Sequence, residues 1–343
     1  MTLEGRFEEG LVVVGGDARQ RLHDARGYGY PLEGNRIGLA PVEAAHLLQR
    51  GDLAAVSAGA ASHDERSFRR ECGGEGLEVS LAVFADLRSR GYYLVPARSP
   101  WVDAPVSGDF AVFERGSGPP DGAVAHAVTT SGEDRTVAVE SLDPGVLAVA
   151  DGEGEVSYFT VRAQRPPGEG DSNRGLPEED RLEADLCTDR VLLWDAPDAL
   201  YERGFYGRPR EETLQCSLVE AAYLATKGVL SLDPAAVTEQ GRSRVGAAFD
   251  RRLAVYTALR GAGAVPKTGF KFGTDFRVYP AVESVDNLGH SSHLVRVVAG
   301  QEGVGMRDLA RDVRLAHGVR KTVVLAGVTG EKITWRALER MTP

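Results

Sequence analysis

The 343-residue chain has no run of about 18 consecutive apolar residues, and its first residues, MTLEGRFEEG, lack the basic-then-apolar order of a secretory signal. These absences predict a cytoplasmic protein without a transmembrane helix. The three cysteines, Cys72, Cys187 and Cys216, are odd in number and far apart, and none has a CxxC or histidine partner at ligand spacing. Neither a disulfide framework nor a structural zinc site is therefore indicated, and the cysteines are expected to be buried or partly buried.

Lysine is scarce, with five residues among 40 basic ones, and 50 acidic residues give a formal net charge of −10. Adaptation to a salty cytoplasm and GC-biased coding explain this bias equally well. An acidic chain is unusual for a nucleic-acid binder, but the local potential decides contact with phosphates. The last quarter is locally basic, with Lys267, Lys271, Arg277, Arg311, Arg314, Arg320, Lys321 and Arg336. The net charge therefore leaves RNA binding open.

What the sequence does contain is an internal repeat. Residues 25–53 resemble residues 202–230, and each stretch has VEAA at the same place before a glycine that ends a helix, Gly51 or Gly228. LAVFADLR (81–88) likewise echoes LAVYTALR (253–260), and DFAVF (109–113) echoes DFRVY (275–279). The chain is therefore predicted to be a tandem duplication of a two-domain unit.

Hydrophobic periodicity alternates between helix-like and strand-like segments, which predicts a mixed α/β (α+β) fold. Helices are expected at the two VEAA segments, at 253–263 and at 306–319. Strands are expected at 11–14, 191–194, 276–282, 293–300, 322–328 and 333–338.

Three blocks follow one another in the last quarter: KFGTDFRVYP (271–280), GHSSHLVRVV (289–298) and RLAHGVRKTVVLAGV (314–328). Breaking an RNA strand without a metal needs a group that takes the proton from the 2'-OH, a group that protonates the leaving 5'-oxygen, and a fixed cation beside the phosphate. Tyr279, His290 and Lys321 can fill these roles in that order.

Each candidate also has a plainer interpretation. Tyr279 ends an alternating apolar run and could be a strand residue with its ring in the core. Lys321, beside another basic residue, could be solvated at a strand entrance. His293 is a neighbouring alternative to His290, and His317 is expected to be structural.

The ordered blocks resemble the archaeal tRNA-splicing (tRNA-intron) endonuclease family, whose C-terminal half carries F-R-V-Y, then H-S-x-x-L-V, then V-R-K before an apolar strand. The family pattern places its histidine first in H-S-x-x-L-V, which selects His290 over His293. The resemblance implies the fused two-repeat form that acts as a homodimer. It also implies a restriction-endonuclease-like C-terminal domain of the tRNA-endonuclease type in each unit.

The repeat divides the chain into two units, and the segment between them is rich in proline, glycine and charge without apolar periodicity, which predicts an exposed linker. We expect an N-terminal α/β domain of the first unit at 1–72, its degenerate nuclease-like domain at 75–163, an exposed linker at 164–185, the N-terminal domain of the second unit at 186–245 and the catalytic nuclease domain at 247–343.

The first unit is expected to be inactive. At the three candidate catalytic positions, in order, alignment places Phe113, Ala123 and, approximately, Pro144. His126 aligns with His293, and no counterpart of RLAHGVRK is present. The first unit would therefore keep the fold without the chemistry, as in family members where an inactive repeat supports an active one.

Two arginines are implied to bind substrate. In the family, arginines matching Arg314 and Arg336 clamp a flipped-out base between their guanidinium planes. This implies precursor tRNA with a bulge-helix-bulge motif as substrate. Both could instead be surface arginines with their stems over the core, and Trp335 is expected to be a core residue or a stacking neighbour.

The turn DGEGE (151–155) of the first unit displays Asp151, Glu153 and Glu155, whereas the second unit has the less acidic VTGEK. Acidic glycine-rich turns are commonly just solvated. In the family, an acidic loop here docks into a basic cleft of the opposite subunit. The resemblance therefore implies a dimer contact, with two active sites for the two cuts that release an intron.

The expected enzyme is a tRNA-intron lyase without a cofactor, leaving a 2',3'-cyclic phosphate and a 5'-OH. No carboxylate cluster suited to Mg²⁺ accompanies the three residues in the sequence. Because the ordinary pKa of tyrosine is near 10, a nearby positive charge such as that of Lys321 would have to lower the pKa of Tyr279 for it to act as a base, and the sequence leaves this open. Two rivals stay open: a noncatalytic RNA-binding or structural subunit of such an endonuclease complex, and a metal-dependent restriction-type nuclease.

Overall fold

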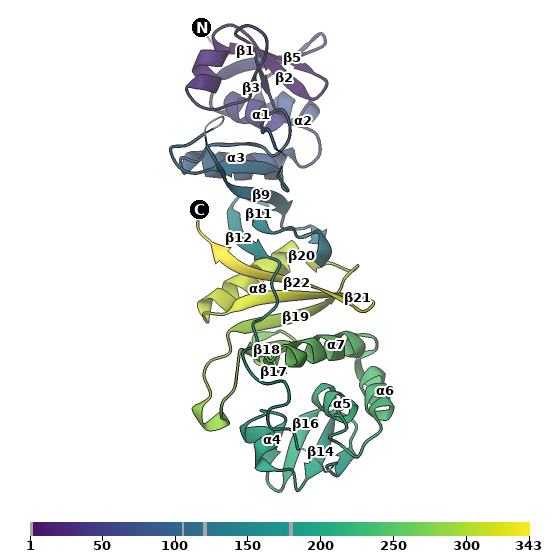
Figure 1. Ribbon diagram of the computed structural model, residues 1–343. Helices are drawn as coiled ribbons and strands as arrows, with labels where there is room; N and C mark the ends of the chain where they lie inside the picture. The colour runs from purple at the N-terminus through teal and green to yellow at the C-terminus, as the bar shows by residue number, and fades with distance from the viewer. Residues whose placement is uncertain (1–2, 105, 119–121, 178–180) are drawn as a thin grey trace.

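The structure is a computed structural model, and it describes residues 3–104, 106–118, 122–177 and 181–343. Figure 1 shows an elongated molecule with a small module at each end and a sheet between them. The first end module (residues 3–71) lies at one extreme, the second (residues 184–245) at the other, and the C-terminus lies beside the middle. The mixed α/β fold predicted from the sequence is confirmed.

The first end module is built on a sheet with strand order β3-β4-β2-β1-β5-β6. Its strands are β1 (Leu3–Glu8), β2 (Leu11–Val14), β3 (Tyr30–Pro31), β4 (Ile37–Leu39), β5 (Leu53–Ala58) and β6 (Ala61–His63). Its helices are the π-helix η1 (Arg19–Asp24), α1 (Pro41–Gln49) and α2 (Glu65–Glu71). Proline suits the first turn of α1, because the N–H that it lacks has no helical partner there.

The second end module repeats this plan around the sheet β13-β14-β16-β15. Its strands are β13 (Ala184–Leu186), β14 (Arg190–Trp194), β15 (Arg208–Arg210) and β16 (Thr213–Ser217). Its helices are α4 (Asp198–Glu202), α5 (Leu218–Thr226) and α6 (Pro234–Val245). Ser217 and Glu220 form a capping box at the start of α5, the second VEAA helix.

One continuous sheet runs through the middle of the molecule, in the order β17-β18-β19-β21-β22-β12-β11-β9-β8-β7. The first unit supplies β7 (Leu94–Pro96), β8 (Phe110–Phe113), β9 (Val124–Gly132), β11 (Gly145–Ala150) and β12 (Val156–Arg162). The second supplies β17 (Val265–Thr268), β18 (Phe276–Tyr279), β19 (His293–Ala299), β21 (Thr322–Thr329) and β22 (Lys332–Met341). The five strands of the second unit correspond to the five strands of the first unit in reverse order, with β17 matching β7 and β22 matching β12. The two units therefore meet through equivalent strands.

The halves join through antiparallel pairing of β12 with β22, from Tyr158 opposite Met341 to Arg162 opposite Ala337. A second junction pairs β10 (Thr136–Val137) with β20 (Val304–Gly305). A buried cluster spans the joint, with residues such as Leu147 and Phe159 from the first unit and Leu309 from the second. The two units therefore share a core.

Helices cover the sheet unequally in the two units. α3 (Leu77–Ser89) and α7 (Ala248–Gly261) are the two echoed helices, but α8 (Met306–Gly318) exists only in the second unit. In the first unit the corresponding residues 133–144 form β10 and the 3-10 turn η2 (Val139–Ser141) instead. The predicted absence of an RLAHGVRK-like helix is thus confirmed. The remaining short turns are η3 (Phe270–Phe272) and η4 (Val285–Asn287).

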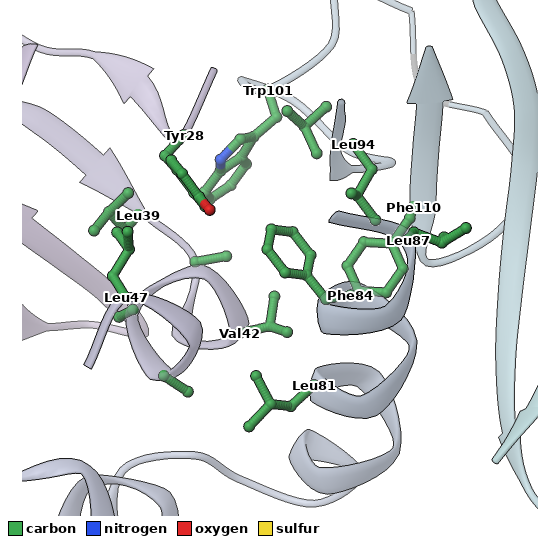
Figure 2. Close-up of a cluster of buried hydrophobic side chains, with 14 of the residues drawn as sticks. Tyr28, Leu39, Val42, Leu47, Leu81, Phe84, Leu87, Leu94, Trp101 and Phe110 are labelled. Carbon is green, nitrogen blue, oxygen red and sulfur yellow. The ribbon is translucent and has the colours of Figure 1, made fainter. Parts of the chain in front are cut away.

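The end module and the sheet of the first unit share one core. Figure 2 shows Phe84 of α3 lying between Val42 and Phe110, with Leu81 of the same helix on the side of Val42. Because apolar burial is roughly proportional to the area removed from water, this shared cluster holds the module firmly against α3.

One expectation about local structure is wrong. The strand expected over 276–282 ends at Tyr279, because Pro280 has no N–H to donate to the ladder. The structure also refines the alignment of 25–53 with 202–230 at its start. Gly29 donates its N–H to Glu43, and Gly207 donates its N–H to Glu220, so Gly29 corresponds to Gly207.

The segment 164–185, expected to be an exposed linker, is partly fitted to the second unit. Gly170 donates its N–H to the carbonyl of Gly263, and Glu169 donates its N–H to the carbonyl of Pro280. A side chain on Gly168 would lie within 2.5 Å of the Ala264 nitrogen. The last residues of the segment belong to β13, so the linker contacts the second unit at several of its described residues.

Candidate active site

Strands β18, β19 and β21 are neighbours, and one end of this trio gathers two of the three candidate side chains. Val278 lies opposite His293, and His293 lies beside the first residue of β21. One position farther on, Tyr279, Ser292 and Lys321 are therefore adjacent, about 5 Å apart from strand to strand. Because side chains alternate along a strand, all three point to the sheet face that packs on α8.

Tyr279 is buried, with 5% of its surface exposed. Its ring packs edge-on against Phe205, with centroids 5.6 Å apart, in a small cluster with Val265 and Val282. Its hydroxyl makes no hydrogen bond within the described residues, yet it is not among the buried polar atoms that lack a partner, so the oxygen reaches solvent. The plainer interpretation, a ring in the core, is therefore correct for the ring but leaves the oxygen accessible.

Burial raises the pKa of Tyr279, and the charge of Arg277 acts in the opposite direction. The guanidinium carbon of Arg277 lies 5.7 Å from the centre of the Tyr279 ring. The charge that acts on Tyr279 is therefore that of Arg277 and not that of Lys321, because Arg277 shares the sheet face with Tyr279 two residues away, whereas the Lys321 ammonium donates to the carbonyl of Ser291.

Lys321 precedes β21, and its Nζ donates a hydrogen bond to the main-chain carbonyl of Ser291. Burial and the nearby charge of Arg277 lower the pKa of Lys321. His290 is the residue before Ser291 and is exposed to solvent. The ammonium is therefore tied to the loop that carries the histidine.

His293 has a different environment. It alternates with Ser292 along β19 and so points to the opposite face from Tyr279 and Lys321. Its Nδ1 lies 2.7 Å from the Ser292 hydroxyl. Burial lowers the pKa of His293, and the charge of Glu339 opposes this. The structure separates His293 from the other two candidates, and it places His317 at the exposed end of α8 rather than in a packed position.

Arg314 lies on α8 and points toward the first unit. Its guanidinium donates a hydrogen bond to the hydroxyl of Ser157 on β12. In the central sheet β12 is four strands away from β18, which corresponds to about 19 Å. Arg314 is therefore not beside Tyr279 in the same chain.

Arg336, on β22, donates hydrogen bonds to the carbonyls of Leu142 and Glu140 in the first unit. It lies opposite Leu325, four residues into β21 from Lys321, or about 13 Å along the strand. Trp335 is half-buried against the core of the second unit, as expected for a core residue. Neither arginine joins the Tyr279 site within one chain.

The acidic turn 151–155 connects β11 to β12 and is exposed. The Asp151 carboxylate accepts the N–H groups of Glu153 and Glu155, at 3.0 and 2.9 Å. Gly152 donates its N–H to Glu133. The Asp151 carboxylate therefore stabilises the turn through hydrogen bonds within it. The carboxylates of Glu153 and Glu155 make no hydrogen bond within the described residues.

The first unit has different residues at the catalytic positions. Val146 lies beside Val128 in the same way that Val324 lies beside Val295. The residue three positions earlier, which corresponds to Lys321, is therefore Asp143. The expected Pro144 is wrong by one residue, and the first unit carries a negative charge where the second carries a positive one.

Sequence reasoning did not single out the two side chains that contact the Tyr279 ring. Arg277 carried a usable signal, because residues two apart on a strand share a face. Phe205 carried none, because its contact with Tyr279 joins distant segments. The cysteine expectation is confirmed: Cys216 is buried, Cys72 and Cys187 are partly buried, and all three are free.

Over the described ranges, with gaps at 105, 119–121 and 178–180, no three His, Cys, Asp or Glu side chains are grouped to hold a metal ion. Within the same residues, no helix is both long enough and apolar enough to cross a membrane.

Residues 249–335 match the family model of the tRNA intron endonuclease catalytic C-terminal domain. The model of the N-terminal domain matches twice, at 3–69 and 182–238, in agreement with the tandem repeat. The tRNA-splicing endonuclease of Halobacterium salinarum is 49% identical over 99% of this chain and 100% of its own length. Those of Haloferax volcanii and Methanosarcina mazei are 48% and 33% identical over 99% of this chain. The chain therefore belongs to the tRNA intron endonuclease family.

Proposed function

We propose that the protein is an endoribonuclease that excises introns from precursor tRNA by cutting both splice sites. One observation carries the proposal: Tyr279 and Lys321 share one sheet face, and His290 lies on the loop that the Lys321 ammonium holds. All three residues lie within the segment that matches the catalytic domain. The relatives named tRNA-splicing endonuclease support the same reaction.

The proposed chemistry needs no redox step. Tyr279 removes the proton from the 2'-OH, and the 2'-oxygen attacks the adjacent phosphorus. The bond from phosphorus to the 5'-oxygen breaks as His290 protonates that oxygen, while Lys321 stabilises the negative charge of the transition state. The products are a 2',3'-cyclic phosphate and a 5'-OH, as in a lyase. Burial raises the pKa of Tyr279 and so opposes the tyrosinate that this step requires, and the positive charge of Arg277 offsets part of that effect.

We infer that two chains assemble into a homodimer that recognises a bulge-helix-bulge RNA. Arg314 and Arg336 lie away from Tyr279 in their own chain, so they fit a role at the active site of the partner, stacking on an unpaired base. The exposed carboxylates of Glu153 and Glu155 suit a basic cleft on that partner. Within each chain we assign catalysis to the domain 247–343 and support to the first unit.

The test is cleavage of an end-labelled transcript with two three-base bulges around a four-base-pair helix, in EDTA, beside a fully paired control. The variants are Tyr279→Phe, His290→Ala and Lys321→Ala, and the matched control is His126→Ala in the first unit. We expect two cuts in the bulges that leave cyclic phosphate, losses of at least about 100-fold in the three variants, and no loss in the control.

Other outcomes would replace this proposal. RNA that binds but stays intact would favour a noncatalytic subunit. Cleavage that EDTA abolishes would favour a metal-dependent nuclease. Full activity of Tyr279→Phe would exclude the assigned base.

A further inference from the structure

Phe205, in the second end module, has an unusual backbone. Its φ is +53°, in the left-handed region that favours glycine, and its side chain is buried. A bulky residue in this region is strained, and such strain persists only where the surrounding structure holds it. A side chain at position 205 therefore has a conformational cost, which indicates that the Phe205 ring has a role that glycine could not fill.

The first unit has glycine at the same place. Tyr28 donates its N–H to the carbonyl of Leu22, and Tyr206 donates its N–H to the carbonyl of Leu200 in the same way. The residues that precede these two tyrosines are Gly27, with φ +66°, and Phe205. The two units thus share the left-handed turn, but only the second places a large side chain on it.

The Phe205 ring lies against the proposed catalytic base. It meets the Tyr279 ring edge-on, with centroids 5.6 Å apart and planes at 73°. The same small cluster includes Val282, Val285 and Leu288 from the segment that runs from Tyr279 to His290. Phe205 therefore touches the base and belongs to the packing beneath the loop that carries the acid.

The first unit fills the corresponding space differently. A side chain on Gly27 would come within 2.8 Å of the Tyr93 ring. Tyr93 precedes β7, and its carbonyl accepts the N–H of Phe113, the residue that replaces the catalytic tyrosine. The strained aromatic residue occurs in the unit that has the tyrosine hydroxyl, and glycine occurs in the unit that has lost it.

We propose that Phe205 is a positioning residue for the RNA cleavage reaction. Its ring fixes the orientation of Tyr279 and the start of the His290 loop, so that the 2'-OH meets the base in reacting geometry. The second end module thereby contributes directly to the rate, and not only to folding. This inference rests on the proposed function, because it assigns Tyr279 as the base.

The test is the Phe205→Gly variant, which reproduces the backbone of Gly27 and removes the ring. We expect kcat on the bulge-helix-bulge transcript to fall about 10- to 100-fold, as for a base displaced by about 1 Å, while KM changes less than about twofold. The unfolding midpoint should be no lower than that of Phe205→Ala, since glycine relieves the strained φ. Phe205→Leu, which keeps most of the volume, should recover kcat to within about fivefold of the wild type.

The matched control is Tyr93→Ala, which removes the ring from the corresponding space in the first unit and should leave kcat unchanged. A wild-type kcat for Phe205→Gly at saturating RNA would overturn the proposal, as would a loss confined to KM. If the glycine variant does not fold, kcat of Phe205→Ala is compared with kcat of Phe205→Leu. A lower kcat for the alanine variant supports the proposal, and equal wild-type values overturn it.

The two proposals fail differently. Inactive wild-type protein, or an active Tyr279→Phe variant, overturns the proposed function and this inference together. A wild type that cuts, a Tyr279→Phe variant that does not, and a Phe205→Gly variant that cuts at full rate overturn only the positioning role.

Discussion

Two buried glutamates occupy the same position in the two VEAA helices and meet different partners. Glu43 accepts the N–H groups of Gly29 and Ala40 and the indole N–H of Trp101, and burial, opposed by these bonds, raises its pKa to about 7. Glu220 instead faces the Lys267 ammonium at 2.6 Å. Burial opposes ionisation of Glu220 too, but the charge and hydrogen bond of Lys267 hold its pKa below the ordinary value.

The ion pair predicts a large and asymmetric effect of substitution. Glu220→Gln leaves the buried Lys267 ammonium without its counter-charge and should lower the free energy of unfolding by about 3–5 kcal/mol. Glu43→Gln, where the partners are neutral, should cost only about 1–2 kcal/mol. Chemical unfolding of both variants measures the difference. Adding Lys267→Met to Glu220→Gln should restore part of the loss, and equal losses in the two single variants would contradict this account.

His46 is a buried histidine without hydrogen-bond partners among the described residues. Both ring nitrogens are unsatisfied, and the ring packs between Tyr28 and Phe84, at 6.1 and 5.3 Å between centroids. Burial, with the charges of Arg88 and Arg50, lowers its pKa to about 4. The folded protein therefore holds this histidine neutral.

Linkage converts this into a pH dependence. Because the folded pKa lies below the ordinary value of 6.5, the contribution of neutral His46 is fully present above that pH and is lost as the pH falls toward 4. The loss amounts to about 3 kcal/mol. His46→Phe keeps an aromatic ring and cannot take up a proton, so its stability advantage over the wild type should grow between pH 7 and 4.5. Unfolding of both proteins at several pH values measures the difference in their free energies of unfolding. A difference that does not change with pH would contradict the prediction.

At the scale of secondary-structure elements, proline and glycine set the end of a strand and a close backbone contact that hydrophobic periodicity does not predict. The apolar pattern continues to Val282, but Pro280 ends β18 directly after Tyr279. The chain then turns away from the sheet into the segment that leads to His290. The position of Tyr279, the proposed base, at the last residue of its strand is thus set by the proline that follows it.

The linker between the units also behaves as a fitted element. Composition rich in proline, glycine and charge suggested an exposed connection, yet residues 168–170 lie against the turn from α7 to β17. That contact could not be foreseen, because glycine is equally common in flexible chain and at close approaches of two backbones.

The fitted linker predicts a clear mutational contrast. Gly168→Ala places a methyl group against the main chain of residues 262–264, which cannot yield as a side chain can, and should lower stability by about 1–3 kcal/mol. Gly261→Ala, at the end of α7 with open space around it, should be neutral or stabilising by up to about 1 kcal/mol. Thermal unfolding compares them. A neutral Gly168→Ala would mean that the linker is loose in solution.

At the scale of the whole molecule, the joint between β12 and β22 holds the two units in one fixed arrangement. Their shared core and continuous sheet place the end modules at opposite extremes (Figure 1). The acidic turn of the first unit faces solvent, and Arg314 and Arg336 of the second unit lie away from their own Tyr279. The proposed function therefore assigns one set of catalytic residues to each chain, and it assigns the turn and the two arginines to contacts with a partner chain.

The proposed homodimer is tested through this turn. The double variant Glu153→Lys, Glu155→Lys reverses its free carboxylates while Asp151 continues to cap the turn, so the local fold is kept. We expect sedimentation to show a shift to monomer and RNA cleavage to fall with it, because like charges then face the basic cleft. Glu331→Lys in the corresponding turn of the second unit is the control and should remain dimeric. A full-strength dimer in the double variant would exclude docking through this turn.

The repeat could be predicted from the sequence alone, as could four of the helices (α1, α5, α7 and α8), six strands and the candidate residues Tyr279, His290 and Lys321. These follow from short patterns, which depend on neighbours along the chain. Three features needed the folded chain: Asp143 corresponds to Lys321, His293 points away from Tyr279, and Arg277 and Phe205 contact the Tyr279 ring. Strand register and the contacting face arise from hydrogen bonds and packing between distant segments, and a shift of one residue reverses every side chain without altering the local pattern.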